Sequence, residues 1–313
     1  MVKKIIKILL KYPLKIANSI YVNRFYRKNL GRVYEIDNII DHLDSILVFS
    51  PHVDDETIGL GGTLLKGKNI ASKMALVYMT DGRGSTSNLS SHRLIEERKR
   101  EGCRVKEAYG FEKIYFLDEP DGGLDSTKDK LIEKIVDVLD KEKPTIIFTP
   151  FLIDGHRDHV ETTRLVIKAL EKWDTSFSRI YMYEVNSPIL PKLITSLTTM
   201  GPSLYNEKGK MYAIFKSQWA MGFDAFRLMD RGKRLLIEEN KTYAAEVFVK
   251  ADVNTAKAMD LALEAEGFNP NDFKQLSSQY NLILSFMKNK KKKKELSDRV
   301  YGILKRNDKI TNL

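Results

Sequence analysis

Two short clusters of histidine and acidic residues contain the side chains best suited to hold a metal ion. The first cluster reads Ser50-Pro51-His52-Val53-Asp54-Asp55-Glu56. His52 and Asp55 are three residues apart, so a turn at the start of a helix can direct both side chains to one point. Asp54 then points elsewhere and keeps a carboxylate that is not a ligand. Imidazole with carboxylate suits a catalytic zinc ion, which takes three protein ligands and leaves one position open.

The second cluster is expected to supply the third ligand. It reads Asp154-Gly155-His156-Arg157-Asp158-His159 and contains two histidines three residues apart. Each cluster follows a short apolar segment that we interpret as a strand. Because a parallel sheet brings the carboxyl ends of its strands to one edge, the clusters can meet there. The spacing alone does not choose between the two histidines.

Short apolar segments alternate with longer helical segments and are expected to position both clusters. The predicted strands are 46–49, 75–79, 114–117, 146–148 and 180–183, and the predicted helices are 57–67, 92–109, 128–141 and 159–172. This order predicts an α/β fold, a Rossmann-like three-layer sandwich with a mostly parallel central sheet. Prolines at 188, 191 and 202 interrupt the pattern, and only helical segments are predicted after them.

The paired clusters resemble those of the LmbE-like, or PIG-L, family of zinc-dependent N-acetylsugar deacetylases. That family has a His-Pro-Asp-Asp-Glu block after its first strand and a His-Pro-Asp-His block later. Val53 and Arg157 stand at the two proline positions here, and neither position supplies a reacting atom in the family. The resemblance covers roughly residues 44–250 and includes Thr80-Asp81-Gly82, Arg98 with Glu101, Asp121-Gly122-Gly123-Leu124 and Tyr243-Ala244-Ala245-Glu246-Val247-Phe248.

The resemblance implies a metal site and a general base. His52, Asp55 and His159 would hold one zinc ion per chain. Ferrous iron is a candidate for the same site in cells, because histidine and carboxylate ligands accept both metals. Asp54 would act as the general base that takes a proton from the attacking water.

The resemblance also implies roles for four residues around the metal. His156 would stabilise the oxyanion and protonate the leaving amine, with Asp158 orienting its ring. Arg98 and Asp121 would line the sugar pocket, although a structural ion pair explains each of them equally well. The triplet at 80–82 is open to a similar alternative, since threonine, aspartate and glycine commonly form turns.

The function implied by the resemblance is hydrolysis of the N-acetyl group of an N-acetylglucosamine-type sugar or glycoconjugate, free or lipid-linked. One alternative is a zinc amidase that acts on a different amide, such as a thiol conjugate. A non-enzymatic binding module is a second alternative, but it would require loss of the base or of a metal ligand. A serine hydrolase is not supported, because the chain has no Gly-x-Ser-x-Gly elbow. The group attached to the sugar and the oligomeric state are not encoded in these motifs.

Composition and charge restrict the class of protein further. The 313 residues include a single cysteine, Cys103, which excludes an intrachain disulfide, fits a reducing cytoplasmic compartment and is expected to be buried. The net charge of +10 comes from the two ends, +8 over residues 1–30 and +7 over 288–313, so the middle carries −5. Because the basic charge lies outside the expected folded body, nucleic-acid binding is not predicted.

The sequence divides into three segments. Residues 1–40 form a basic amphipathic extension, 41–250 the deacetylase domain, and 251–313 a helical, basic extension whose lysine run at 290–294 is expected to be solvated. Lysines every three or four residues from Lys3 to Lys11 predict a helix that Pro13 kinks or ends, and they interrupt any signal peptide. Residues 1–30 are expected either to bind an anionic membrane, at the inner face, or to pack on the domain.

Overall fold

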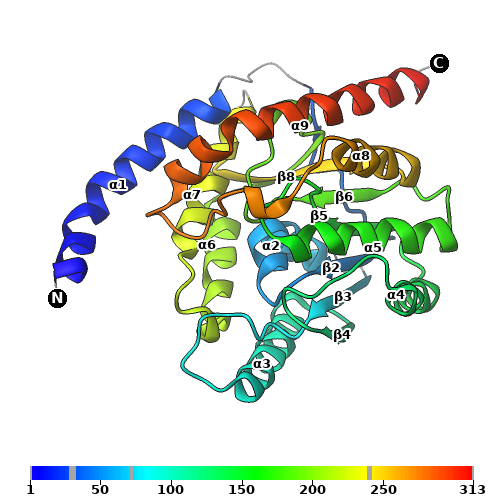
Figure 1. The fold of residues 1–313 in the computed structure, drawn as a ribbon, viewed down its shortest axis with the longest axis horizontal. Helices are drawn as coiled ribbons and strands as arrows, with labels where there is room; N and C mark the ends of the chain where they lie inside the picture. Colours follow the sequence, from blue (N-terminus) through cyan, green and yellow to red (C-terminus); the bar gives the residue numbers. More distant parts are fainter. Residues whose placement is uncertain (1, 28–32, 71–72, 238–241, 312–313) are drawn as a thin grey trace.

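The computed structural model describes residues 2–27, 33–70, 73–237 and 242–311, without the side chains of 2–11 and 307–311. A sheet of eight strands lies at the centre of this part of the chain (Figure 1). The strands are β1 (Glu35–Ile36), β2 (Ser45–Ser50), β3 (Lys73–Thr80), β4 (Lys113–Glu119), β5 (Ile146–Pro150), β6 (Ile180–Tyr183), β7 (Ser196–Met200) and β8 (Ala244–Ala251). Their spatial order is β1-β7-β8-β6-β5-β2-β3-β4.

The sheet is mostly parallel, which confirms the predicted α/β fold. Only β8 runs against its neighbours, β6 and β7, among the pairings of the described strands. The five predicted strands correspond to β2, β3, β4, β5 and β6. Every residue of β5 and β6 is buried, as is every residue after the first in β2 and β3. Burial of this kind is expected because a parallel sheet is covered by helices on both faces.

The helices cover both faces of the sheet (Figure 1). On one face α2 contacts α3 and α6, whereas on the other α5 contacts α4 and α8. The helices predicted in the first half of the chain correspond to α2, α3, α4 and α5. The α-helices are α1 (Val2–Arg27), α2 (Asp55–Asn69), α3 (Ser91–Tyr109), α4 (Asp129–Glu142), α5 (Arg157–Trp173), α6 (Pro202–Met211), α7 (Phe223–Lys233), α8 (Val253–Ala265) and α9 (Leu282–Thr311). Short 3₁₀ helices are η1 (Pro191–Leu193), η2 (Tyr212–Ile214), η3 (Lys216–Gln218), η4 (Arg234–Leu236) and η5 (Pro270–Asp272).

The N-terminal helix α1 continues past Pro13 and packs on the domain. Val22 and Tyr26 are fully buried against α7. The two helices approach closely because α7 has a glycine at the contact, and a Cβ at Gly232 would collide with Val22. The second half of α1 therefore packs on the domain, as one of the two interpretations of residues 1–30 expected. This contact with α7 holds the part of the helix that follows Pro13.

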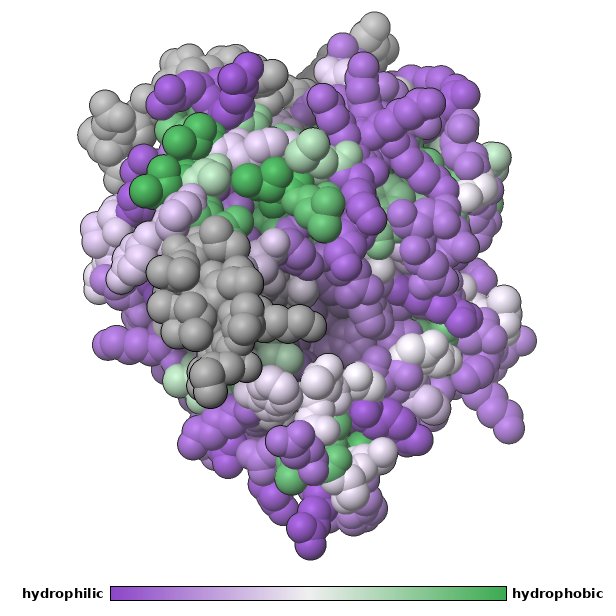
Figure 2. Space-filling view, turned by 60° about the vertical axis from the view of Figure 1, so that its left-hand side comes forward, coloured by the Kyte–Doolittle hydropathy of each residue, from purple (hydrophilic) through white to green (hydrophobic). Residues whose placement is uncertain are grey.

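The same helix presents a second, unpacked face. Tyr12, Ile16 and Ile20 are four residues apart and are 74%, 63% and 64% exposed. Figure 2 views the side of the molecule that carries α1. Hydrophobic residues gather on this side of the surface, next to hydrophilic ones. None of the helices in the described ranges combines the length and the apolar character that a bilayer-crossing segment needs.

One expectation about exposure holds only in part and another is wrong: Lys290, Lys291 and Lys294 are exposed as expected, but Lys293 and Cys103 depart from the prediction. The lysine run at 290–294 is part of α9, and Lys293 is buried, where it donates a 2.6 Å hydrogen bond to the hydroxyl of Ser187. Burial lowers the pKa of Lys293 to about 8. Cys103 is exposed, because the buried face of α3 is formed by Leu94, Arg98, Glu101, Gly102 and Val105.

A network of buried charges joins α6, α7 and β8. The ammonium of Lys208 lies 2.6 Å from a carboxylate oxygen of Asp230 and 2.8 Å from one of Glu246. The ammonium of Lys233 lies 3.1 Å from Asp230 and 2.9 Å from Glu184. The carboxylate of Glu246 also accepts hydrogen bonds from two backbone amides of α2, at 2.7 and 2.8 Å. The network therefore anchors the helix that follows the first histidine cluster.

Candidate active site

The two clusters meet at the carboxyl edge of the sheet. The first follows β2 and leads into α2, and the second follows β5 and leads into α5. β2 and β5 are neighbours, with β3 and β4 on one side of them and β6 on the other. The order of the strands reverses between β2 and β5, and this switch point is where open α/β sheets bind their ligands.

One carboxylate oxygen lies between two imidazole rings. Oδ2 of Asp55 is 3.0 Å from Nδ1 of His52 and 3.3 Å from Nε2 of His159. The same oxygen accepts a 2.9 Å hydrogen bond from the backbone N–H of His52. Although burial raises the pKa of a carboxyl group, the two imidazoles hold the pKa of Asp55 well below its usual range. The structure thus brings together the three side chains that the family resemblance implies as ligands.

The environment of His159 fits a metal ligand. The ring is fully buried, and neither nitrogen makes a well-aligned hydrogen bond with the described residues. Its Nδ1 lies 3.0 Å from Oδ1 of Asp154. A carboxylate behind a ligating histidine fixes the tautomer and leaves the other nitrogen facing the metal. A buried ring whose Nε2 meets only ligand-type atoms is the arrangement expected around a divalent cation.

A third histidine also approaches this point. His52, His156 and His159 offer nitrogen atoms that lie within 4.8 Å of one another, and so do groups on His52, Asp121, His156 and Asp158. The rings of His156 and His159 stack with centroids 4.9 Å apart. Imidazoles and carboxylates in such a cluster form a donor set that zinc and ferrous iron both accept.

Asp54 is held in a strained backbone conformation. Its φ is 131°, a value that residues other than glycine rarely adopt. The side chain is buried, Oδ2 has no hydrogen-bond partner among the described residues, and Oδ1 lies 3.7 Å from a guanidinium nitrogen of Arg98. Burial, together with repulsion by Asp55 and Glu56, raises the pKa of Asp54 well above its usual value, against the attraction of Arg98. Strain of this kind is concentrated at functional sites.

The contacts of His156 and Asp158 differ from the expected pairing. The carboxylate of Asp158 accepts a 2.6 Å hydrogen bond from the backbone N–H of Gly122 and lies 3.3 Å from Nε2 of His52. It makes no contact of this kind with the ring of His156. Instead, the backbone N–H of Asp158 donates to Nδ1 of His156 at 3.2 Å. An acceptor at Nδ1 leaves the proton of the neutral ring on Nε2, while burial and the neighbouring histidines lower the pKa of His156 to about 4.

Asp121 lies in the site and Arg98 lies behind it. Oδ1 of Asp121 is 3.2 Å from Nε2 of His52, and its other oxygen accepts a 3.0 Å hydrogen bond from the backbone N–H of Gly84. Arg98 is 1% exposed and donates to the backbone oxygen of Val53. These contacts fit the structural interpretation for Arg98, because its guanidinium supports the turn that carries the first cluster.

Three supporting residues had no assigned role in the sequence analysis. Asp154 contacts His159 and also accepts a 2.9 Å hydrogen bond from the backbone N–H of His156. Glu101 accepts hydrogen bonds from the backbone N–H and the hydroxyl of Ser217, both at 2.7 Å, and lies 3.4 Å from Arg98. The position of Asp154, two residues ahead of the histidine pair in the second cluster, was a usable signal for its role. Ser217 has no such signal, because it lies in an irregular region far from the clusters in sequence.

Comparisons with known proteins agree with this geometry. The sequence pattern of the PIG-L family, described as GlcNAc-PI de-N-acetylase, matches residues 47–170, which include both clusters. Diacetylchitobiose deacetylase of Thermococcus kodakarensis is 33% identical over 142 residues. The matched region is 44% of this chain and 53% of that protein, so the match spans about half the length of the curated relative.

Two solved structures share the fold. A conserved protein of Thermus thermophilus is 26% identical, with a TM-score of 0.55 over 66% of this chain and 94% of that one. The N,N′-diacetylchitobiose deacetylase of Pyrococcus horikoshii is 22% identical, with a TM-score of 0.57 over 81% of this chain and 94% of that one. Both histidine clusters lie inside residues 47–170, the segment that matches the PIG-L family.

Proposed function

We propose that the chain is a metal-dependent hydrolase that removes the acetyl group from an N-acetylglucosamine-type sugar or glycoconjugate. The observation that carries this proposal is the convergence of His52, Asp55, His156 and His159 at the switch point of the sheet, with Asp54 next to Asp55 in the chain. The similarity to diacetylchitobiose deacetylase supports the substrate class. Water and the amide are converted to acetate and a free amine.

His52, Asp55 and His159 are the proposed ligands of one zinc ion, and ferrous iron suits the same donors. When bound, such an ion polarises a carbonyl oxygen and makes water more acidic. The excess of carboxylates in the site favours a divalent cation, since Asp55, Asp121 and Asp158 all lie within 3.3 Å of a nitrogen of His52. Several carboxylates gathered in one buried site repel each other, and a bound cation offsets that repulsion.

Asp54 is the proposed proton-transfer residue and His156 the proposed donor to the oxyanion. The unpaired Oδ2 of Asp54 is an acceptor for a proton from the attacking water, and the same proton then passes to the leaving amine. Nε2–H of the neutral His156 ring donates a hydrogen bond to the oxyanion, because Nδ1 is already engaged by a backbone N–H. Asp121 is the proposed sugar-contacting residue, since it borders the cluster and is part-buried.

The test is a panel of N-acetylated compounds that includes N-acetylglucosamine, diacetylchitobiose, lipid-linked N-acetylglucosamine and an N-acetylated thiol conjugate. Mass spectrometry is expected to detect the loss of one acetyl group from the sugar compounds, together with free acetate. Loss of acetyl only from the thiol conjugate would favour the alternative amidase. Turnover of none of them by metal-loaded protein, together with tight binding of one, would favour the binding module.

We also propose that α1 binds an anionic membrane surface from the cytoplasmic side. The support is the charge of +8 over residues 1–30 and the exposed stripe of Tyr12, Ile16 and Ile20. Basic residues contribute about 1 kcal/mol each near an anionic bilayer, and apolar side chains add to this when they enter the interface. A lipid-linked sugar would then meet the enzyme at the surface that holds it.

The exposed stripe gives a prediction that does not disturb the fold. We expect the double substitution Ile16→Ser with Ile20→Ser to weaken binding to phosphatidylglycerol vesicles by about tenfold or more, because each isoleucine loses roughly 1.5–3 kcal/mol of apolar burial when fully inserted. The melting temperature should stay close to that of the parent, since both side chains are exposed. Vesicle flotation measures the binding.

A matched control replaces two exposed leucines elsewhere, Leu43→Ser with Leu261→Ser, which are 81% and 54% exposed. This variant should float with vesicles as the parent does. Equal losses in the two variants would mean that the stripe has no specific role, and binding that resists high salt would contradict the electrostatic part of the proposal.

A further inference from the structure

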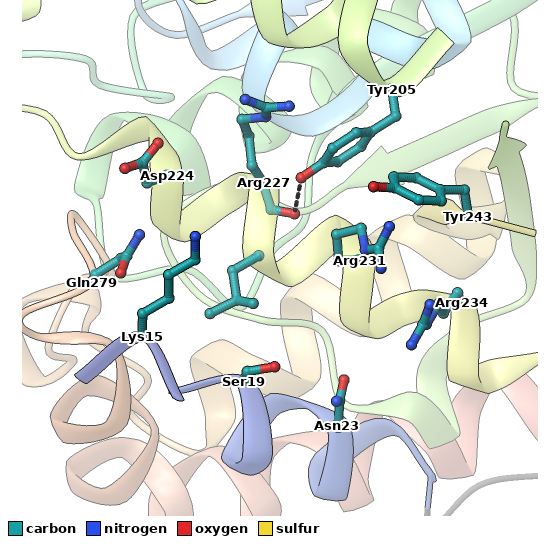
Figure 3. A pocket seen from close by; sticks show the side chains of 11 residues that line it. Lys15, Ser19, Asn23, Tyr205, Asp224, Arg227, Arg231, Arg234, Tyr243 and Gln279 are labelled. Atoms are coloured by element: carbon teal, nitrogen blue, oxygen red, sulfur yellow. Dashed lines mark hydrogen bonds between the residues drawn. The ribbon is translucent and has the colours of Figure 1, made fainter. Parts of the chain in front are cut away.

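A cavity of about 420 Å³ lies between α1 and the helical segment of α7 and η4 (Figure 3). None of the residues of the proposed metal site lines it. Its volume is within the range of about 300–1,000 Å³ that is typical of small-molecule sites. Figure 3 shows two walls of this cavity. Helix α1 forms one wall with Lys15, Ser19 and Asn23, and α7 with η4 forms the other with Arg227, Arg231 and Arg234.

The cavity is strongly cationic. Four basic side chains line it, against one carboxylate, that of Asp224, which is exposed. No ion pair between these four side chains and a carboxylate occurs in the described part of the chain. Four like charges that share one carboxylate repel each other, so the arrangement favours an anionic ligand.

Two of the arginines are held in place by tyrosine rings. The guanidinium of Arg227 lies 4.6 Å from the ring centroid of Tyr205, and that of Arg231 lies 3.6 Å from the ring centroid of Tyr243. Stacking against the rings fixes the planes of the two guanidinium groups.

The chemistry of the lining selects among anions. Arginine donates paired hydrogen bonds in a planar arrangement that matches two oxygens of a phosphate. The cavity adds the ammonium of Lys15 and the amides of Asn23 and Gln279, which suit a polar group attached to that phosphate. We propose that this cavity binds the phosphate of a phosphate ester, either a soluble compound or the headgroup of a phospholipid. The proposal does not depend on the deacetylase activity.

The geometry of α1 keeps both sources of phosphate open. Lys15, Ser19 and Asn23 are four residues apart and form one stripe, which lines the cavity. The exposed stripe that contains Ile16 and Ile20 lies on the same helix and follows the first by one residue. Because neighbouring stripes on a helix lie side by side, a bilayer that meets the apolar stripe would place its phosphates near the mouth of the cavity.

The test compares two double variants of the full chain. Arg231→Gln with Arg234→Gln removes two charges from the cavity. Arg24→Gln with Arg27→Gln removes two exposed charges from α1 outside the cavity and serves as the matched control. The probes are inorganic pyrophosphate and glycerol 3-phosphate, measured by isothermal titration calorimetry, and vesicles of phosphatidylcholine with phosphatidylglycerol, measured by flotation. Circular dichroism checks that each variant is folded.

If the ligand is a soluble phosphate, the parent and the Arg24/Arg27 variant should both bind a soluble probe. The cavity variant should then bind the same probe more weakly, by about tenfold or more for each arginine removed, as expected for a lost charged hydrogen bond. A lipid headgroup is the ligand if only vesicle binding falls, and falls further in the cavity variant than in the control. Either result supports the cavity as a phosphate site. Equal behaviour of the two variants towards every probe would overturn it, and acetyl release by the parent, measured separately, would stand in both cases.

Discussion

Replacement of Asp54 by asparagine is expected to lower kcat by about 10²–10⁴-fold while the chain keeps its metal, because an amide cannot accept the proton that the carboxylate accepts. Asparagine keeps the shape of the side chain and is among the residues that tolerate a positive φ, so the strained backbone at this position should persist. Asp55→Ala should behave differently and lose the metal. Steady-state kinetics and metal analysis of the same preparations separate the two effects.

Asp118 offers a matched control for this substitution. It is also an aspartate with a positive φ, 57°, but it is largely exposed and pairs with Lys99 away from the histidines. Asp118→Asn should leave both kcat and metal content unchanged. Equal loss of metal from the Asp54→Asn and Asp55→Ala variants would contradict separate roles for the two neighbouring acids.

Replacement of His159 by alanine is expected to remove the metal and with it all measurable turnover. His159 is one of three proposed ligands, and its loss should cost more than the 10–100-fold in affinity that is typical of a residue that only supports a ligand. The metal content measured by elemental analysis should fall from about one ion per chain to near zero, because a site with three protein ligands has little redundancy. His52→Ala should give the same result from the other cluster.

The control for a lost histidine is His92→Ala, which removes an exposed imidazole, 85% accessible, on α3. That variant should keep its metal and its activity. Because His159 is fully buried, circular dichroism must show that its alanine variant is folded. Full metal occupancy in a folded His159→Ala protein would remove His159 from the ligand set and leave His156 as the second-cluster ligand.

The fold around the site follows from local sequence. β2 and β5 are short apolar segments whose carboxyl ends carry the two clusters, so predicting a parallel sheet was enough to predict that the clusters meet. The contacts of single side chains could not be predicted in the same way. The carboxylate of Asp158 bonds with the 122–124 loop rather than with His156, and only the folded position of that loop decides this.

Strands β1, β7 and β8 were not predicted. β7 reads Ser-Leu-Thr-Thr-Met, and it follows a proline-rich segment that hides a strand pattern. β8 is antiparallel and almost wholly buried, so its apolar run has no alternation and is as typical of a buried helix. Cys103 shows that the burial of a single residue in a helix is hard to predict. A shift of one position along the helix is enough to turn a buried side chain into an exposed one.

The buried charges around Lys208 bear on how the protein responds to heat. Moving an ion out of water costs less as the temperature rises, because the hydration of charged groups carries a large negative entropy. The ion pairs of Lys208 and Lys233 with Asp230, Glu184 and Glu246 therefore contribute relatively more to the free energy of unfolding in warm than in cold solution. Since Glu246 also holds the amides of α2, the helix that follows the first histidine cluster should be among the last parts of the molecule to loosen as it is heated.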